Sequence, residues 1–166
     1  MRADKVYLVG FMAAGKTSLA RELGRRLDWR VEDVDERIEG RERQTIAEVF
    51  AAHGEAWFRA VERAVVQDLL APRHMVVATG GGTFADPESR ALIKADGAVF
   101  WIDVPMAQLV ARLPLDGRRP LAANRQQFEQ LYHARGLAYA QAHVRLDGAR
   151  ASIGDLADHV VEWLGG

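Results

Sequence analysis

The sequence has no cysteine, which excludes disulfide bonds, thiolate metal ligands and a cysteine nucleophile. It also lacks long hydrophobic runs: residues 98–102 form one of the longest, well short of the roughly 20 apolar residues that a membrane-spanning helix needs. Residues 1–5 lead into a short apolar stretch without a signal-peptide pattern. We therefore expect a cytoplasmic protein with no membrane partner.

Lysine is scarce and the net charge is small. The chain has 3 lysines among its 22 basic residues and a formal net charge of −1, which argues against a nucleic-acid partner. The sum hides two regions, because residues 31–62 carry nine acidic residues against four arginines, whereas residues 105–145 carry six arginines against two acidic residues. Near-neutrality is therefore a cancellation between an acidic segment and a basic one.

Five short apolar segments alternate with helical patterns along the chain, an order that predicts a parallel sheet with crossover helices. The composition, 49% hydrophobic and 27% charged, is that of a globular protein, and 166 residues suit one domain. We predict a three-layer doubly wound α/β sandwich over residues 1–166, with ligands at the carboxyl ends of a five-stranded parallel sheet. The expected strands are residues 5–9, 30–33, 75–79, 98–103 and 143–146.

Local signals mark several helix ends. A capping box at Thr45 opens a helix that should stop near Gly54, and Asp86 and Ser152 are N-cap residues for two later helices. A separate helix is predicted over residues 55–70, with an apolar stripe. We expect three of the four tryptophans to lie in the core: Trp57, Trp101 and Trp163. Residues 113–123 hold two prolines, a glycine and two arginines without periodicity, which predicts a mobile loop of functional length.

One motif carries specific chemistry. Residues 10–17 fit the phosphate-loop pattern G-x-x-x-x-G-K-[ST] and stand between a predicted strand and a predicted helix. Backbone N–H groups and the start of the helix would bind phosphate oxygens, Lys16 would reach the β- and γ-phosphates of ATP, and the Thr17 hydroxyl would bind Mg²⁺. The residues expected to bind the nucleotide are Gly10, Ala13, Ala14, Gly15, Lys16, Thr17 and Ser18.

Other patterns narrow the class of nucleotide protein. No Asn-Lys-x-Asp element occurs, which argues against a GTP switch protein, and the chain is too short for a transporter ATPase domain. The remaining motifs are Asp33-Val34-Asp35 after the second strand, Phe58-Arg59-Ala60-Val61-Glu62 on a helix, Gly80-Gly81-Gly82 after the third strand, Arg118-Arg119 in the loop and Arg135 on the next helix. From the residues alone we infer a Mg²⁺-ATP kinase for a small, anionic, hydroxylated acceptor.

In this order the motifs resemble the shikimate kinase family, from about Val6 to Asp147, and the resemblance implies a P-loop kinase fold with a mobile lid over about residues 113–123. It implies that Asp33 holds Mg²⁺ through water, together with Thr17. It further implies that Asp35 accepts hydrogen bonds from the hydroxyls of shikimate. The catalytic residues would be Lys16, Asp35 and the lid arginine Arg119.

The same resemblance assigns the anion-binding residues. Arg59 and Arg135 would grip the carboxylate of shikimate, for which an arginine fork is suited, and Gly80, Gly81 and Gly82 would line the acceptor site. Arg112 and Arg119 would lie near the nucleotide. Without the resemblance, Arg59 with Glu55 and Glu62 reads as an ion-pair ladder on an exposed helix.

The implied activity is ATP-dependent phosphorylation of the 3-hydroxyl of shikimate, in aromatic amino-acid biosynthesis, by a monomer. Two alternatives stay open: a kinase of the same fold for another hydroxylated acid such as gluconate, and a non-catalytic nucleotide-binding regulator. The sequence departs from the family pattern at two positions. Ala13 replaces a glycine of the phosphate loop, and we expect an ordinary negative φ there. Leu137 replaces a proline that is common after the second carboxylate-binding arginine.

Overall fold

A five-stranded sheet lies at the centre of the computed structural model, which describes residues 1–113 and 125–166. All neighbouring strands are parallel and their order is β2-β3-β1-β4-β5. This confirms the predicted sheet; the third strand ends one residue earlier than expected, and the fifth begins and ends one residue later. The strands are β1 (Lys5–Val9), β2 (Arg30–Asp33), β3 (Met75–Ala78), β4 (Ala98–Asp103) and β5 (Val144–Asp147).

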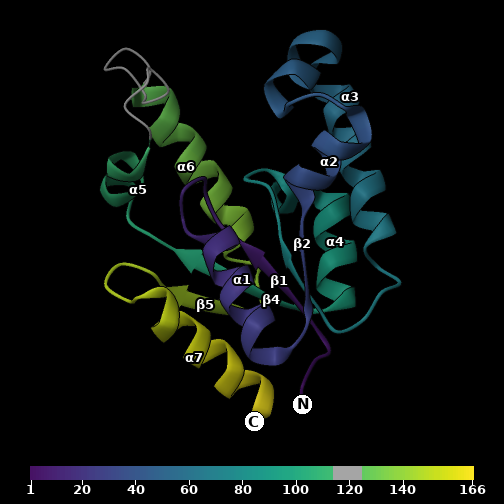
Figure 1. Ribbon diagram of the computed structural model, residues 1–166. Helices are drawn as coiled ribbons and strands as arrows, with labels where there is room; N and C mark the ends of the chain where they lie inside the picture. The colour runs from purple at the N-terminus through teal and green to yellow at the C-terminus, as the bar shows by residue number, and fades with distance from the viewer. Residues whose placement is uncertain (114–124) are drawn as a thin grey trace.

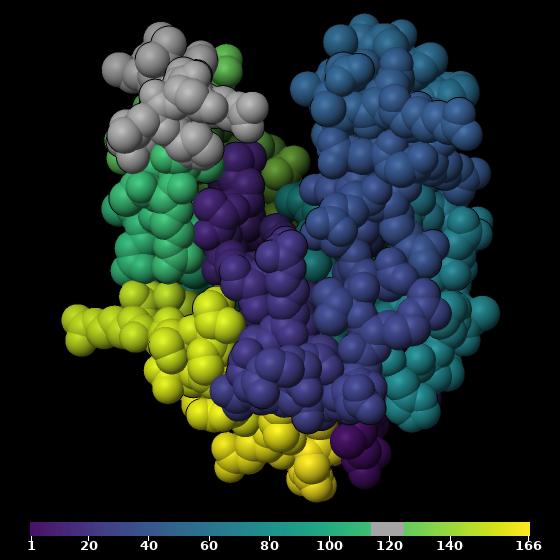
Figure 2. Space-filling view, viewed as in Figure 1, coloured from purple at the N-terminus to yellow at the C-terminus, as the bar shows by residue number. Residues whose placement is uncertain are grey.

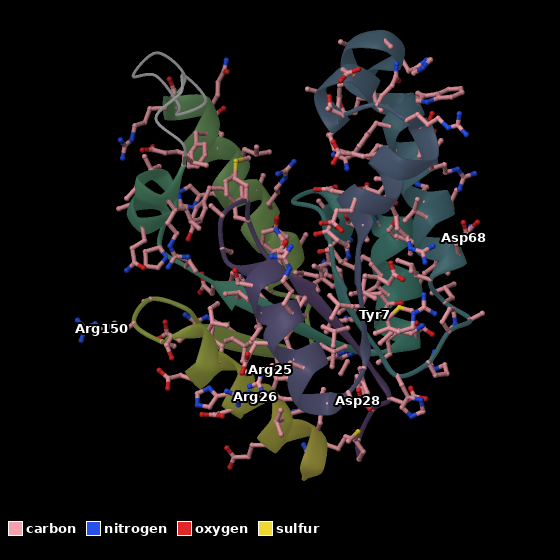
Figure 3. The ribbon with its side chains drawn as sticks, in the orientation of Figure 1. Tyr7, Arg25, Arg26, Asp28, Asp68 and Arg150 are labelled. Carbon is pink, nitrogen blue, oxygen red and sulfur yellow. The ribbon has the colours of Figure 1, made fainter. Side chains whose placement is uncertain are left out.

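Helices cover both faces of this sheet (Figure 1). On one face α1 packs against α7, where Arg26 of α1 donates hydrogen bonds to the carboxylate of Asp158 and the carbonyl oxygen of Gly154 (Figure 3). On the other face α3 packs against α2 and α4. The helices are α1 (Lys16–Leu27), α2 (Val34–Glu42), α3 (Ile46–Asp68), the 3₁₀ turn η1 (Thr83–Ala85), α4 (Pro87–Asp96), α5 (Met106–Arg112), α6 (Arg125–Tyr139) and α7 (Ile153–Gly165).

The predicted N-caps are present. The side chains of Thr45, Asp86 and Ser152 accept hydrogen bonds from backbone N–H groups in the first turns of α3, α4 and α7. The predicted break before residue 55 is present too, because Gly54 has φ 80° and ψ 179° inside α3. Two helical segments therefore meet at Gly54 with a kink, and the second carries the residues that face the site.

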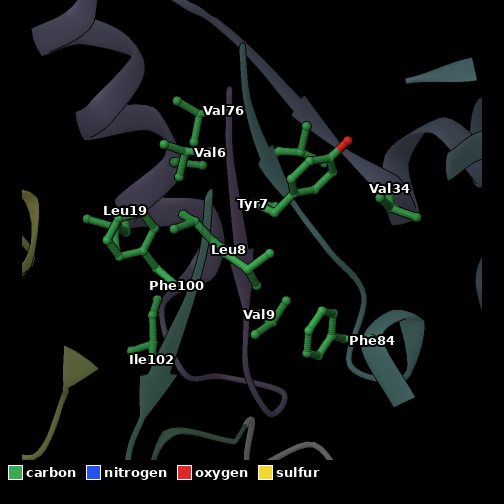
Figure 4. Close-up of a cluster of buried hydrophobic side chains, with 14 of the residues drawn as sticks. Val6, Tyr7, Leu8, Val9, Leu19, Val34, Val76, Phe84, Phe100 and Ile102 are labelled. Carbon is green, nitrogen blue, oxygen red and sulfur yellow. The ribbon is translucent and has the colours of Figure 1, made fainter. Parts of the chain in front are cut away.

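The core fills both faces of the central strand. All five residues of β1 are buried. Figure 4 shows Val6 beside Leu19 and Phe100 on one side of the strand, and Val9 beside Phe84 on the other. This alternation is what a strand with a period of two residues produces when helices cover both faces of its sheet.

One core prediction is wrong. Trp57 is 48% exposed and stacks on His53 with ring centroids 4.6 Å apart, whereas Phe58 is buried. The buried stripe of this segment runs through Phe58, Val61, Glu62 and Val65, so Trp57 lies one position off the stripe, on the solvent side. Trp101 and Trp163 are half-buried and pack against the core.

Most of the loop predicted over residues 113–123, with Arg118 and Arg119, lies outside the described residues. Within the described ranges, no helix combines the length and the apolar character needed to cross a membrane.

Candidate active site

The phosphate-loop residues connect the carboxyl end of β1 to the start of α1. Gly15 has φ 106° directly before the helix, a conformation that favours glycine. Ala13 has φ 64°, so the negative φ expected there is wrong. The tight turn around Ala13, closed by the Ala14 N–H donating to the Phe11 carbonyl oxygen at 3.2 Å, requires the left-handed region whether or not the residue is glycine. A non-glycine residue in this region costs roughly 1–2 kcal/mol.

Lys16 points back into this loop. Its Nζ donates to the carbonyl oxygens of Gly10 at 2.6 Å and Phe11 at 3.1 Å. Desolvation lowers the pKa of Lys16 to about 8, although the nearby Asp35 opposes the shift. The ammonium group therefore stays charged at neutral pH, and its hydrogen bonds within the described part of the chain go to neutral carbonyls, an arrangement from which arriving phosphate oxygens can take it. Ser18 lies exposed in the first turn of the same helix.

Thr17 and Asp33 meet beside the loop. The Thr17 hydroxyl donates to Asp33 Oδ2 at 3.2 Å, and Asp33 Oδ1 accepts the N–H of Glu36 and so caps α2. A cavity of about 220 Å³ that Arg21 and Glu36 also line adjoins these two side chains. A hydroxyl and a carboxylate are hard oxygen donors of the kind that Mg²⁺ prefers, with phosphate oxygens and water completing its shell. The pair therefore fits a magnesium ion.

Asp35 stands in the first turn of α2, on the site side. Desolvation raises the pKa of this carboxyl to about 6; the negative charge of Asp33 adds to the rise and Lys16 opposes it. Asp35 is thus ionised at neutral pH, yet close enough to its pKa to exchange a proton with a bound hydroxyl.

Three consecutive glycines bring together the three charged residues predicted to bind the acceptor. A Cβ atom on Gly80 would lie 2.5 Å from Asp35 Oδ1, one on Gly81 would lie 3.0 Å from Arg135 Nη1, and one on Gly82 would lie 2.6 Å from Arg59 Nη2. None of the three has a positive φ. Each glycine is therefore needed for close approach of a charged side chain and not for its backbone conformation.

Arg59 is held by a buried partner. Its Nη1 donates to Glu62 Oε1 at 2.8 Å, and Glu62 is only 1% exposed. The exposed Glu55 lies 3.9 Å away and is a weaker partner. The ion-pair ladder on a solvated helix face is thus the wrong interpretation, because the strong pair points inward.

Two arginines from α5 and α6 complete the set of charged residues. Arg112 Nη1, at the end of α5, donates to the carbonyl oxygens of Ala13 at 3.2 Å and Ala14 at 3.4 Å. Arg135 on α6 lies over the ring of Phe11, 5.7 Å from its centroid. Figure 2 shows the surface hollowed between the blue segment of α2 and α3 and the purple phosphate loop. Contacts join the phosphate loop, the three glycines, Asp35, Arg59, Arg112 and Arg135 into one cluster, whereas Arg119 lies outside the described residues.

Sequence reasoning missed two buried hydroxyl groups at the glycine residues. Thr83 lies between Gly80 and Glu62, and the Tyr139 hydroxyl donates to the carbonyl oxygen of Gly81. Thr83 directly follows the three glycines, and Tyr139 ends the motif that contains Arg135 on α6, but the motifs give neither hydroxyl a role. The signal that could have found Thr83 is its place directly after three glycines that line a site.

Comparison with known proteins decides the family. The family model for shikimate kinase matches residues 12–165. The chain belongs to the shikimate kinase family. The shikimate kinase of Persephonella marina is 37% identical over 142 residues, covering 85% of this chain and 87% of the relative. That of Aromatoleum aromaticum is 37% identical over 159 residues, covering 93% and 91%.

Solved structures of shikimate kinases share the fold. The enzyme from Acinetobacter baumannii in complex with shikimate superposes with a TM-score of 0.90 at 30% identity, covering 97% of this chain and 92% of that one. The enzyme from Aquifex aeolicus gives 0.88 at 30% identity, covering 98% and 96%. As a shikimate kinase family member the chain is an enzyme with kinase activity, and ATP is its phosphoryl donor.

Proposed function

We propose that this chain transfers the γ-phosphoryl group of ATP to the 3-hydroxyl of shikimate, giving shikimate 3-phosphate and ADP. One observation carries the proposal: the three glycines set two arginines and one carboxylate around a single space that borders the phosphate loop. Two guanidinium groups suit a carboxylate ligand, and a carboxylate near its pKa suits a hydroxyl. An anionic, hydroxylated acceptor matches this set.

On the donor side, the backbone of the phosphate loop and Lys16 bind the phosphates. Lys16 exchanges the carbonyl oxygens of Gly10 and Phe11 for β- and γ-phosphate oxygens. Arg112 stands against the backbone of the same loop, from which it reaches the nucleotide. Arg119 is proposed to add positive charge at the transferring group.

On the acceptor side, Arg59 and Arg135 bind the carboxylate and thereby orient the ring, while Asp35 accepts the hydrogen bond of the 3-hydroxyl. The attacking oxygen forms a bond to the γ-phosphorus as the bond to the bridging β,γ-oxygen breaks, and ADP leaves with that electron pair. The hydroxyl proton goes to Asp35. Phosphoryl transfer depends mainly on position and neutralised charge, so orientation is the larger contribution of these residues.

Thr17 and Asp33 would hold Mg²⁺. The ion supplies charge neutralisation on the β- and γ-phosphate oxygens when it is bound. Because Asp33 also caps α2, the helix that carries Asp35, the same carboxylate links the donor side to the acceptor side.

The test is a panel of hydroxylated acids assayed for ATP-dependent ADP release: shikimate, quinate and gluconate. We expect turnover with shikimate at a kcat/KM at least tenfold above the other two, since misplacing one hydroxyl or the carboxylate leaves buried polar groups unpaired. Lys16→Ala is the matched control and should abolish turnover while the protein stays folded. Preference for gluconate, or full activity of the Lys16 variant, would refute the assignment.

A further inference from the structure

A chain of three hydrogen bonds runs beneath the acceptor side of the site. The Gly80 N–H donates to Thr83 Oγ1 at 2.9 Å, the Thr83 hydroxyl donates to Glu62 Oε2 at 2.9 Å, and Glu62 Oε1 accepts from Arg59 at 2.8 Å. Thr83 is 0% exposed and Glu62 1% exposed. One hydroxyl therefore connects the glycines to the arginine that faces them.

We propose that Thr83 is a positioning residue for the acceptor, acting through Glu62 on Arg59 and through the Gly80 N–H on the glycines. The proposal rests on the proposed function, because it names a further determinant of acceptor affinity at the same site. Thr83 itself has no exposed surface, so it acts without touching the acceptor.

The buried carboxylate makes the hydroxyl necessary. Glu62 has two oxygens and no access to water, so each oxygen needs a donor. Arg59 satisfies one and Thr83 the other. Without the hydroxyl, Oε2 is left with no donor among the described contacts, and the Gly80 N–H loses its acceptor in the same step.

Arg59 would respond first. Its guanidinium lies against the Cα of Gly82, where even a methyl group would not fit, so a small shift of Glu62 moves the fork against the glycines or away from them. Bidentate binding of a carboxylate tolerates little misorientation. A disturbance at Thr83 should therefore weaken binding of the acceptor and leave binding of ATP nearly unchanged.

The experiment compares steady-state kinetics of the wild type with those of three variants. Thr83→Val removes the hydroxyl at constant shape, and we expect the KM for shikimate to rise about tenfold while the KM for ATP stays within about twofold. Thr83→Ser keeps the hydroxyl and should restore the wild-type KM. Thr79→Val is the matched control, because it removes a buried hydroxyl that donates to the Leu8 carbonyl oxygen at 2.8 Å within the sheet; its shikimate KM should not change.

Several outcomes would overturn the proposal: an unchanged shikimate KM in Thr83→Val, an equal rise in both KM values, a failure of Thr83→Ser to restore, or the same rise in Thr79→Val. If Thr83→Val does not fold, Glu62→Gln replaces it and must raise the shikimate KM selectively. The wild-type acid panel separates this test from the proposed function: if another acid is turned over, its KM is the quantity compared. If no acid is turned over, hydrogen exchange at the Gly80 amide is measured instead. The exchange should be faster than in the wild type for Thr83→Val and unchanged for Thr79→Val.

Discussion

At the scale of single residues, the site depends on glycines, because a residue with no side chain lets a charged group approach the backbone closely. Gly82 lies so close to Arg59 that a Cβ atom would stand 2.6 Å from one guanidinium nitrogen and 2.8 Å from the other. Real Cβ contacts are never this short, so a larger residue must displace the arginine. The arginine is the flexible partner, and binding is therefore more sensitive to this change than folding.

We predict that Gly82→Ala raises the KM for shikimate by about tenfold with little change in the KM for ATP, because the displaced fork loses its bidentate geometry. Gly40→Ala in α2 is the matched control. Nothing lies within 4 Å of the Cβ that it adds, and it should stabilise the helix by about 0.5–1 kcal/mol. Steady-state kinetics with both substrates measure the effect; a rise in the ATP KM as large as that for shikimate would count against it.

Asp35 gives the site a dependence on pH. Its pKa is raised from 3.8 to about 6 by desolvation and by Asp33, against the opposing charge of Lys16, with smaller contributions from Glu62 and Glu39. Since the ionised form accepts the proton, the fraction of active enzyme falls as the pH falls through the raised pKa. We predict that kcat/KM for shikimate declines below about pH 6.

The measurement is a pH profile of kcat/KM over about pH 5 to 8, with Asp35→Asn beside the wild type. The variant should be slower throughout and lose the decline near about pH 6. A wild-type profile that stays flat down to about pH 5 would show that the proton of the acceptor does not depend on this carboxylate.

Much of the site could be predicted from the sequence because short motifs encode it. The phosphate loop and Asp35 follow directly after strand ends, Arg59 stands in the Phe-Arg-x-x-Glu pattern of α3, and the structure brings these residues close together. The places of Thr83 and Tyr139 beside these motifs are visible in the sequence, but their hydrogen bonds are not, because these form only once the glycines have folded back against them. The negative φ predicted for Ala13 was wrong for a related reason. The turn of the phosphate loop dictates a left-handed conformation, and alanine tolerates it.

At the scale of elements, helix ends are predictable where one side chain decides them. Asp86 and Ser152 accept N–H groups three residues ahead, so the signal is local. Sheet order has no such signal, because it depends on pairing between distant segments. The end of α3 is a further case of this kind, since it is fixed by a residue far away in the sequence.

The residue that fixes the end of α3 is Lys5 of β1, which is fully buried. Its Nζ donates to the carbonyl oxygens of Leu69 at 2.6 Å and Leu70 at 3.0 Å and pairs with Asp96 at 2.7 Å. The Tyr7 hydroxyl donates to the same carboxylate at 2.6 Å. One ammonium group thus joins the central strand to the ends of α3 and α4. It lies at the amino ends of the strands, whereas the site lies at their carboxyl ends.

We predict that Lys5→Met lowers the free energy of unfolding by roughly 3 kcal/mol, the lower end for removing one partner of a buried pair, because Asp96 keeps Tyr7 and Arg73 as donors. Lys94→Met, on a side chain with access to water, is the control and should cost at most about 0.5 kcal/mol. Urea denaturation of both variants gives the difference. Equal stability of the two would mean that the buried ammonium contributes nothing net.

At the scale of the whole molecule, the charge cancellation becomes a separation in space. The acidic segment forms β2, α2 and the first part of α3, and the basic segment includes α5 and α6; Figure 1 shows α2 and α3 on one side of the molecule and α5 and α6 on the other. The acidic side carries Asp35 together with Arg59, and the basic side carries Arg112 and Arg135. Because Arg59 on α3 and the phosphate loop belong to different elements, loss of Arg59 should leave stabilisation by ATP in place, even though Asp33 connects the two sides.

Ligand-induced stabilisation tests this expectation without turnover. A ligand at 100 times its Kd stabilises the folded state by about 2.7 kcal/mol, which for a chain of this size raises Tm by roughly 5–10 °C. We predict that Arg59→Ala loses most of the shift with shikimate and keeps the shift with ATP. Arg63→Ala, which removes a pair with Asp86 at 2.7 Å, is the control: its Tm falls but both shifts remain. A full shikimate shift in the Arg59 variant would remove this arginine from the acceptor site.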